Sequence, residues 1–144
     1  MTTAPVKLAW PDPWILLSII YAGRERGGAT LHNIIAAADG LIHAVPTHGE
    51  LDGALARLFA AGHAVRDGAT FRISEPMRAA HAARDRTGGM VRHEMDEVQR
   101  ILGAERWTPS YRPPISGAGD VVSRVEYDAA VESYVGRPRR RPTA

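Results

Sequence analysis

Residues 47–74 read THGELDGALARLFAAGHAVRDGATFRIS, and this stretch decides the fold that the sequence predicts. Thr47 and Glu50 have the spacing of a capping box, in which each side chain binds a backbone amide at the start of a helix. One apolar stripe follows at helical spacing and is formed by Leu51, Leu55, Leu58 and Phe59. Gly62 then stands where a left-handed residue ends a helix. We therefore expect an amphipathic helix between Thr47 and Gly62, with its leucines buried.

A short hairpin is predicted directly after this helix. Asp67-Gly68 lies between two β-prone runs, Ala64–Arg66 and Ala69–Ile73. An Asp-Gly pair in this setting predicts a two-residue turn in which both residues have positive φ. A capped helix that leads into a tight hairpin is the second half of a winged helix-turn-helix.

Two helices are expected upstream of this stretch. Asp12-Pro13 opens the first, with Asp12 as the N-cap and Pro13 at the first helical position, and Gly23 ends it. Thr30 caps the second, whose inward residues are Leu31, Ile34, Ile35 and Ala38. The order of helix, helix, turn, helix and hairpin is that of a winged helix.

The run TLHNIIAAADGLIHAVPTHGELDGALARLFAAG at residues 30–62, followed by the hairpin that carries Arg72, resembles small bacterial winged-helix proteins of mostly unassigned function. The resemblance covers residues 12–75, which is about half of the chain. It implies a winged-helix fold for these residues and no particular activity.

The whole chain is expected to be mainly α with a small β-hairpin: a winged helix-turn-helix followed by C-terminal helices. The expected parts are an N-terminal arm (1–11), the winged-helix domain (12–75), C-terminal helices (76–103), a connector rich in proline, glycine and aromatic residues (104–119), a short strand with a last helix (120–135) and a basic disordered tail (136–144). In the fifth part, Val121-Val122 is the expected strand, and Ser123 with Glu126 forms a second capping box.

The C-terminal helices are predicted at Met77–Arg86 and around residues 90–102. The second of these carries an apolar stripe of Val91, Met95, Val98 and Leu102 and ends at Gly103. Its carboxylates Glu94, Asp96 and Glu97 are interpreted as a solvated face. Two uses of the stripe stay open: pairing with a second copy in a homodimer through residues 90–102, or packing back on the same chain.

Charge is distributed unevenly along the sequence. Residues 1–74 carry six basic and six acidic side chains, residues 75–136 carry eight basic and ten acidic ones, and residues 137–144 carry four arginines and no acid. The net charge of +2 therefore comes from the tail, and the rest of the chain is close to neutral. An obligate DNA-binding domain usually has a basic face of its own, so charge alone does not predict one here.

The composition also bounds the environment. The chain has no cysteine, which excludes disulfides and thiolate metal sites and fits a reducing cytoplasm. No apolar run is long enough to span a membrane, and no secretory signal is recognised. We expect a cytoplasmic bacterial protein without a membrane partner.

The candidate DNA-contacting residues come from three places. The helix after Thr47 is expected to expose its N-terminal face, with Thr47, His48, Asp52 and Arg57, to the major groove. Arginines of the hairpin and of the first loop are candidates for phosphate contacts: Arg24, Arg26, Arg66 and Arg72. A solvated hairpin whose arginine stems cover the core is the alternative for that group.

The tail supplies the third group, Arg137, Arg139, Arg140 and Arg141. Gly136-Arg137-Pro138 resembles the core of an AT-hook, a motif that lies in the minor groove of A·T-rich DNA. Val135 stands where that motif has a basic residue, so a non-specific electrostatic tail is the favoured interpretation.

Metal binding and catalysis are not predicted. None of the six histidines forms a zinc-type pair on one helix, and they are interpreted as single surface residues. Phosphate-binding glycine loops and nucleophile motifs are also missing, so we expect no enzyme and no cofactor. 

The leading hypothesis is a winged-helix DNA-binding protein, a small transcriptional regulator or nucleoid-associated factor whose partner is duplex DNA. The alternative is a winged-helix protein–protein interaction module without DNA binding. A third reading is a small-molecule sensor with a pocket at Leu41–Val45 or at Trp107 and Tyr111.

Overall fold

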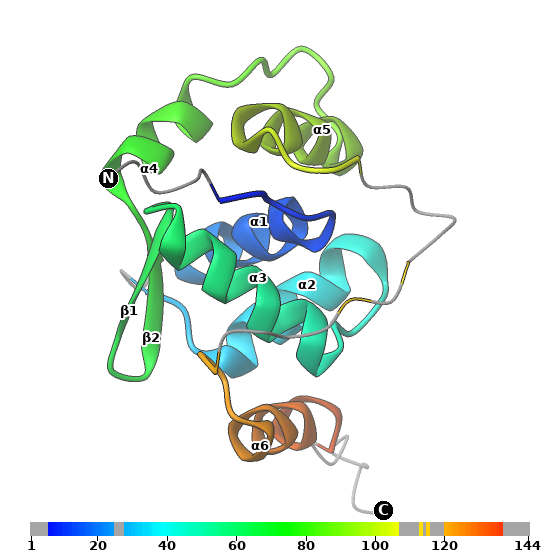
Figure 1. Cartoon of the computed structure of the whole chain (residues 1–144). Helices are drawn as coiled ribbons and strands as arrows, with labels where there is room; N and C mark the ends of the chain where they lie inside the picture. The colour runs from blue at the N-terminus through cyan, green and yellow to red at the C-terminus, as the bar shows by residue number, and fades with distance from the viewer. Residues whose placement is uncertain (1–5, 25–27, 107–112, 114, 116–119, 137–144) are drawn as a thin grey trace, which may run out of the picture.

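The computed structural model describes residues 6–24, 28–106, 113, 115 and 120–136, and within them the chain is mainly helical with one small antiparallel sheet. The elements are α1 (Pro11–Gly23), α2 (Leu31–Ile42), α3 (His48–Ala60), β1 (Ala64–Asp67), β2 (Thr70–Ile73), α4 (Glu75–Ala82), α5 (Val91–Leu102) and α6 (Arg124–Val135). Their arrangement is shown in Figure 1.

The central element is α1, which packs against α2, α3, α5 and β2. Every residue from Pro11 to Ile19 is buried, as expected for a helix that is apolar on nearly all sides. The predicted N-cap is wrong: the helix starts at Pro11, and Asp12 lies inside its first turn, where it accepts a hydrogen bond from the Ala9 amide at 2.7 Å. Asp12 is held inside because its carboxylate has a partner on α3, described below.

The N-terminal arm is not separate from the body. Among its described residues, Leu8 and Trp10 are buried in the hydrophobic core. Trp10 stacks on Trp14 of α1, with ring centroids 6.4 Å apart, and its indole nitrogen donates to the Pro113 carbonyl at 3.2 Å. Two large aromatic rings bury enough apolar area to hold this segment on α1.

Both the cap and the register predicted for α3 are confirmed. Thr47 Oγ1 accepts from the Glu50 amide at 3.1 Å, and Glu50 Oε1 accepts from the Thr47 amide at 2.8 Å, which completes the capping box. Leu51, Leu55 and Leu58 are fully buried. Gly62 has a left-handed φ of 78° just beyond the helix.

The hairpin forms, but its turn lies one residue later than predicted. Asp67 pairs with Thr70, so Gly68 and Ala69 are the turn residues, and of these two only Gly68 has positive φ. This register places Phe71 in the core opposite Arg66. The predicted turn would pair Phe71 with Ala64 and keep the ring on the same face, so the shift changes its partner and not its burial. The Thr70 hydroxyl donates to the Asp67 carbonyl at 3.0 Å, which supports the observed pairing.

A third chain segment joins the hairpin. Ala29, just before α2, forms a bridge with Phe71 through two hydrogen bonds, from Ala29 N to Phe71 O at 2.8 Å and from Phe71 N to Ala29 O at 2.7 Å. The loop between the first two helices therefore lies beside β2. The sequence did not predict this pairing, because a single residue has no strand pattern.

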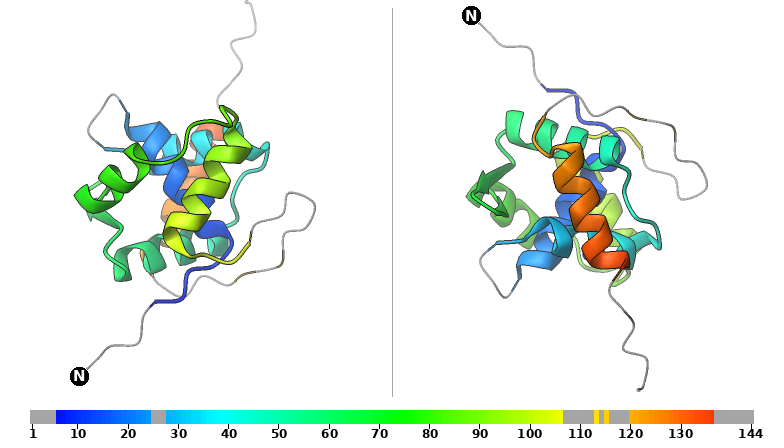
Figure 2. Two further views of the ribbon diagram at one scale, coloured as in Figure 1. Left: turned by 90° about the horizontal axis from the view of Figure 1, so that it is seen from above. Right: turned by 90° about the horizontal axis from the view of Figure 1, so that it is seen from below.

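Helices α5 and α6 cover opposite sides of the body formed by α1, α2 and α3 (Figure 2). On α5, Met95, Val98 and Leu102 are buried in the chain's own core, whereas Met90 and Val91 are exposed. The packing-back alternative therefore describes the apolar stripe of this chain. A homodimer through residues 90–102 would have only the two exposed residues and the polar face to offer.

Helix α6 packs on α2 and is fixed by its tyrosines. The Tyr127 hydroxyl donates to the Pro46 carbonyl at 2.6 Å, and the Tyr134 hydroxyl donates to Asp39 Oδ2 at 2.6 Å. The capping box of Ser123 and Glu126 is present as predicted. None of the described helices is both long and apolar enough to cross a membrane.

Candidate nucleic-acid interface

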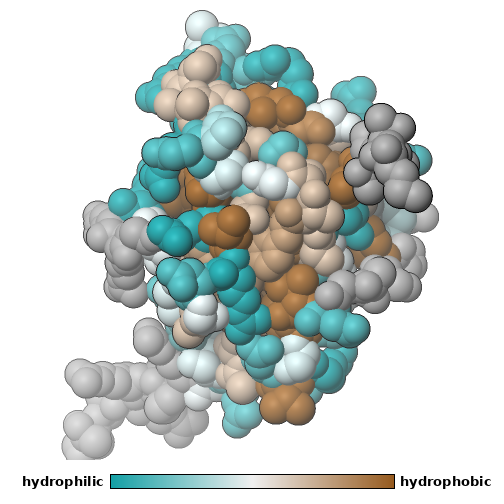
Figure 3. Space-filling model, turned by 60° about the vertical axis from the view of Figure 1, so that its left-hand side comes forward, coloured by the Kyte–Doolittle hydropathy of each residue, from teal (hydrophilic) through white to brown (hydrophobic). Residues whose placement is uncertain are grey.

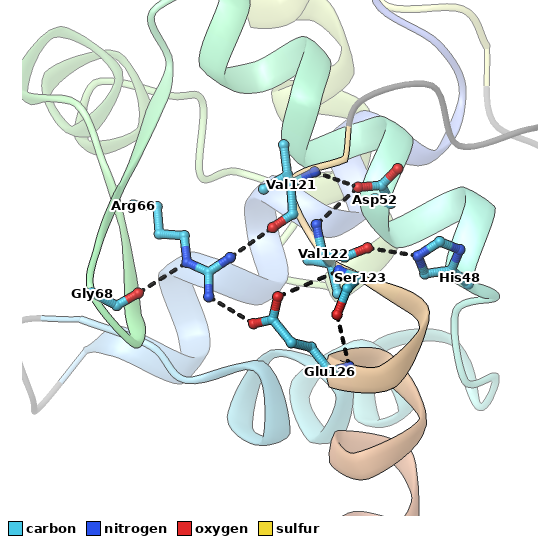
Figure 4. Close-up of polar contacts among 8 residues, drawn as sticks. All are labelled: His48, Asp52, Arg66, Gly68, Val121, Val122, Ser123 and Glu126. Atoms are coloured by element: carbon cyan, nitrogen blue, oxygen red, sulfur yellow. Dashed lines mark hydrogen bonds and ion pairs between the residues drawn. The ribbon is translucent and has the colours of Figure 1, made fainter.

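The N-terminal half of α3 is where the sequence places the DNA-reading surface, and in the structure this half is covered. Asp52, expected to be exposed, is only 3% exposed. Its Oδ1 accepts hydrogen bonds from the Val121 amide at 2.8 Å and the Val122 amide at 2.9 Å (Figure 4). Two backbone donors replace the water that a carboxylate would otherwise require, so the exposed position predicted for Asp52 is wrong.

We call residues 121–126 the C-terminal strap. Val121 and Val122 form a bend and no strand, which corrects the strand predicted there. The reason is that their amides bind a side chain instead of a neighbouring strand. The strap thus joins the start of α6 to α3.

His48 contributes a second contact between α3 and the strap. Its Nε2 lies 2.7 Å from the Val122 carbonyl oxygen, and its ring meets Tyr127 edge-on with centroids 5.5 Å apart. A carbonyl only accepts, so Nε2 carries the proton and donates. The imidazole predicted to face DNA therefore faces the chain's own C-terminal segment.

Arg66 ties β1 to the same strap (Figure 4). Its guanidinium donates to the Val121 carbonyl at 2.6 Å, to Glu126 Oε2 at 2.8 Å and, through Nε, to the Gly68 carbonyl at 2.9 Å. The hydrogen bond from Arg66 lowers the pKa of Glu126. All three guanidinium nitrogens are used within the chain, which leaves this arginine poorly available for phosphate.

Arg57 is engaged in a buried ion pair with Asp12. Its Nε lies 2.8 Å from Oδ2 and its Nη2 lies 2.9 Å from Oδ1, a bidentate geometry, and its side chain is 19% exposed. Burial raises the pKa of Asp12, while the Arg57 hydrogen bonds act in the opposite direction. If the Arg57 side chain turned outward to bind a phosphate, the buried carboxylate of Asp12 would lose its ion-pair partner. The role of Arg57 is therefore structural.

The coverage of α3 is continuous. From His48 to Phe59 every residue is buried or partly buried, and exposure begins only at Ala60. Thr47 is exposed, but its hydroxyl and its amide take part in the capping box. A helix that reads bases must place several side chains in the major groove, and in this arrangement α3 has no such face.

The remaining described candidates, Arg24 and Arg72, lie away from the strap and from α3. The Arg24 guanidinium sits 4.2 Å from the centroid of the Tyr21 ring, and the Arg72 side chain is 47% exposed. Both line one hollow, which neither Leu41–Val45 nor α3 lines. Three further arginines of this hollow were missed in the sequence: Arg78, Arg84 and Arg86. Their spacing follows no single periodicity, because Arg84 and Arg86 lie beyond the end of α4.

Next to this hollow lies a buried polar cluster that includes Glu94 and His81, two residues expected at the surface. Glu94 of α5 is 8% exposed, and its Oε2 is 2.8 Å from His81 Nε2 and 3.1 Å from Arg84 Nη2. The Tyr21 hydroxyl donates to its other oxygen. Against the effect of burial, the hydrogen bonds from Tyr21 and His81 lower the pKa of Glu94, and burial lowers the pKa of His81.

The buried position of Glu94 corrects the solvated face predicted for it, and His81 is likewise buried, not on the surface. A signal was present: Glu94, Val98 and Leu102 recur at i, i+4 and i+8, which places the carboxylate in line with the apolar stripe. Within the described ranges, no group of three or more histidines and carboxylates is arranged to hold a metal ion.

The predicted site is therefore divided. Around α3, the chain itself binds Thr47, His48, Arg57 and Arg66. Arg24 and Arg72 line a separate hollow. The other candidates lie outside the described residues: Arg26, the tail arginines Arg137, Arg139, Arg140 and Arg141, and the aromatic pair Trp107 and Tyr111.

Comparison of the chain with protein-family models, curated proteins and solved structures finds no match.

Proposed function

We propose that this chain is a winged-helix protein that binds duplex DNA through its phosphates, and that α3 reads no bases while the strap covers it. The element order supports the winged helix. Three helices precede the hairpin, and Ala29, between the first two, pairs with β2. This is the connectivity of a helix-turn-helix whose hairpin forms the wing.

The observation that carries the DNA proposal is the placement of Arg24 and Arg72 in the lining of one hollow at the wing. Neither guanidinium is buried in an ion pair: among the described residues, Arg72 has only a 3.5 Å contact with the exposed Asp67, and Arg24 stacks on Tyr21. Exposed ion pairs are worth little, so phosphate can replace Asp67 at small cost. The four arginines of residues 137–144 add charge of the same sign.

A salt titration of binding to random-sequence duplex DNA tests the proposal. We expect the logarithm of the binding constant to fall linearly with the logarithm of salt concentration. Replacing Arg24 or Arg72 by alanine should reduce the slope by about one unit each. Arg124→Ala is the matched control, because Arg124 is also an exposed arginine but lies on α6 and pairs with Asp128 on the same helix.

A fourth variant, with alanine at residues 137, 139, 140 and 141, separates the tail from the wing. If the wild type does not bind at low salt, the DNA proposal fails. If binding depends on the tail arginines and not on Arg24 or Arg72, the wing has another use.

The second candidate is a protein-interaction module without DNA binding, and the covered α3 favours it. From His48 to Phe59 this helix has no exposed residue to place in a groove, and the chain outside the tail is close to neutral. If the titration detects no DNA binding, the protein-interaction module becomes the favoured function.

A further inference from the structure

The hollow beside the wing has the size and the charge of a small ligand site. It has a volume of about 260 Å³ and lies between the end of α1, Gly28, β2, α4 and the residues that follow α4. Figure 3 turns the side that carries the hairpin and α4 toward the viewer, and hydrophilic and apolar residues are interspersed there. This volume is just below the usual range for ligand cavities, so a compact ligand fits better than an extended one.

Cations dominate the lining. Among the described residues, the lining includes five arginines, Arg24, Arg72, Arg78, Arg84 and Arg86, together with His81, and no aspartate or glutamate. Burial lowers the pKa of His81, so the imidazole is neutral near neutral pH and its Nε2 donates to Glu94. The positive charge of the hollow therefore comes from the guanidinium groups.

Most of this charge is not neutralised by the described part of the chain. Arg84 is balanced by the buried Glu94. Arg72 and Arg78 contact Asp67 and Glu75, whose side chains are largely exposed, and such pairs contribute little. Arg24 and Arg86 have no carboxylate partner among the described residues. A polyanion is the ligand that such an excess of arginine favours.

The chain also holds some of these groups in place before any ligand arrives. Arg84 Nη1 donates to the His81 carbonyl at 2.8 Å while its Nη2 faces Glu94. Arg86 Nη2 donates to the Ala82 carbonyl at 3.1 Å, and Arg24 rests on the Tyr21 ring. Side chains that are already ordered lose less entropy on binding, which raises affinity.

The floor of the hollow is apolar and tightly built. Ile19, Phe71 and Ile73 line it, and the first two are almost completely buried. A Cβ on Gly28 would lie 3.0 Å from Thr70 Cβ and 3.4 Å from Arg72 Cγ, so a glycine allows this close approach to β2. An apolar floor lowers the local dielectric and strengthens the attraction between guanidinium and anion.

From this combination we infer that the hollow is a binding site for a small ligand that carries phosphate groups. Guanidinium is planar and binds phosphate oxygens in pairs, and a tetrahedral phosphate can accept such pairs from several directions. The phosphates contact Arg24, Arg72 and Arg86, and the less polar part of the ligand lies over Ile20 and Ile73, the partly exposed apolar residues of the lining. The inference does not depend on DNA binding.

Calorimetric titration with sodium pyrophosphate, at an ionic strength held constant with sodium chloride, tests this site. The wild type should bind pyrophosphate, and orthophosphate more weakly. A double variant, Arg24→Gln with Arg86→Gln, should lose affinity by at least about tenfold, because each charge-assisted hydrogen bond is worth more than 1.4 kcal/mol. The matched control is Arg92→Gln with Arg124→Gln, two exposed arginines outside the hollow, which should leave the affinity unchanged.

Two outcomes overturn the inference: no binding by the wild type, or equal affinity in the wild type and the Arg24/Arg86 variant. Circular dichroism of each variant shows that a loss of binding is not a loss of fold.

A duplex-DNA arm separates the two proposals. If DNA binds and pyrophosphate does not, the hollow contacts only the duplex backbone and the ligand site is refuted. If pyrophosphate binds and DNA does not, the ligand site stands and the proposed function fails.

Discussion

Arg66 and Arg72 stand on the two strands of one hairpin, yet they have opposite surroundings. Arg66 is 29% exposed and donates to two carbonyls and a carboxylate of its own chain. Arg72 is 47% exposed and has one 3.5 Å contact, with the solvated Asp67. The strap lies against Arg66, and Arg72 lines the hollow. The same residue type can therefore be a structural element or an available cation, depending on what a distant segment places opposite it.

The largest change in stability is expected at Arg57. Among the described arginines of the predicted DNA interface, it is the one paired with a fully buried carboxylate. Arg57→Ala leaves Asp12, which is fully buried, without its bidentate partner, and should reduce the free energy of unfolding by about 3–5 kcal/mol. Urea denaturation measures this change. Arg72→Ala is the control and should change stability by less than about 0.5 kcal/mol. A loss below about 1 kcal/mol for Arg57→Ala would show that this arginine is not structural.

The pH dependence of the same variant has a defined sign. Burial already raises the pKa of Asp12, and without Arg57 the groups that oppose this effect are weakened. A folded-state pKa above the unfolded value means that the native state binds a proton more readily, so stability rises as the pH falls toward the unfolded pKa. The deficit of Arg57→Ala relative to wild type should therefore shrink in mildly acidic buffer.

An intermediate effect is expected at Asp52, the contact between α3 and the strap. Asp52→Ala removes the acceptor of the Val121 and Val122 amides and should cost about 1–3 kcal/mol. Hydrogen exchange at these two amides should accelerate more than exchange in the core of α1. Unchanged protection of both amides would mean that the strap is held by other contacts.

The smallest change in stability is expected when each of the two hairpin arginines is replaced by alanine. Arg66→Ala should cost about 1 kcal/mol, because it removes three hydrogen bonds at a partly exposed site, and Arg72→Ala should cost close to nothing. Thermal and urea unfolding of the two variants side by side measure the difference. Equal losses would remove the distinction between the two faces of the hairpin.

Much of the architecture could be predicted because its causes are local. The capping boxes at Thr47 and Ser123 depend on residues three positions apart, and the buried leucines of α3 depend on a helical repeat. The position of the hairpin turn was predicted less closely. The turn lies one residue after Asp67-Gly68, and Asp67 pairs with Thr70, whose hydroxyl donates to the Asp67 carbonyl.

The candidate site was predicted less well because its residues depend on partners far along the chain. Arg57 meets Asp12 across 45 positions, and Asp52 meets Val121 and Val122 across 69 and 70. No periodicity links such positions, so charged residues were assigned to the surface by residue type alone. The same limit hid Glu94, whose partners Tyr21 and His81 come from two other helices.

The sequence by itself determined the helices, the hairpin, the capping motifs and the apolar stripes, since each is set by interactions within a few residues. Only the tertiary structure decided which arginines are available. It placed the strap against α3 and thereby occupied His48, Asp52 and Arg66, and it gathered Arg24, Arg72 and Arg86 around one hollow. The physical reason is that a charged side chain takes its role from its neighbours in space, and those neighbours are fixed by the packing of the core.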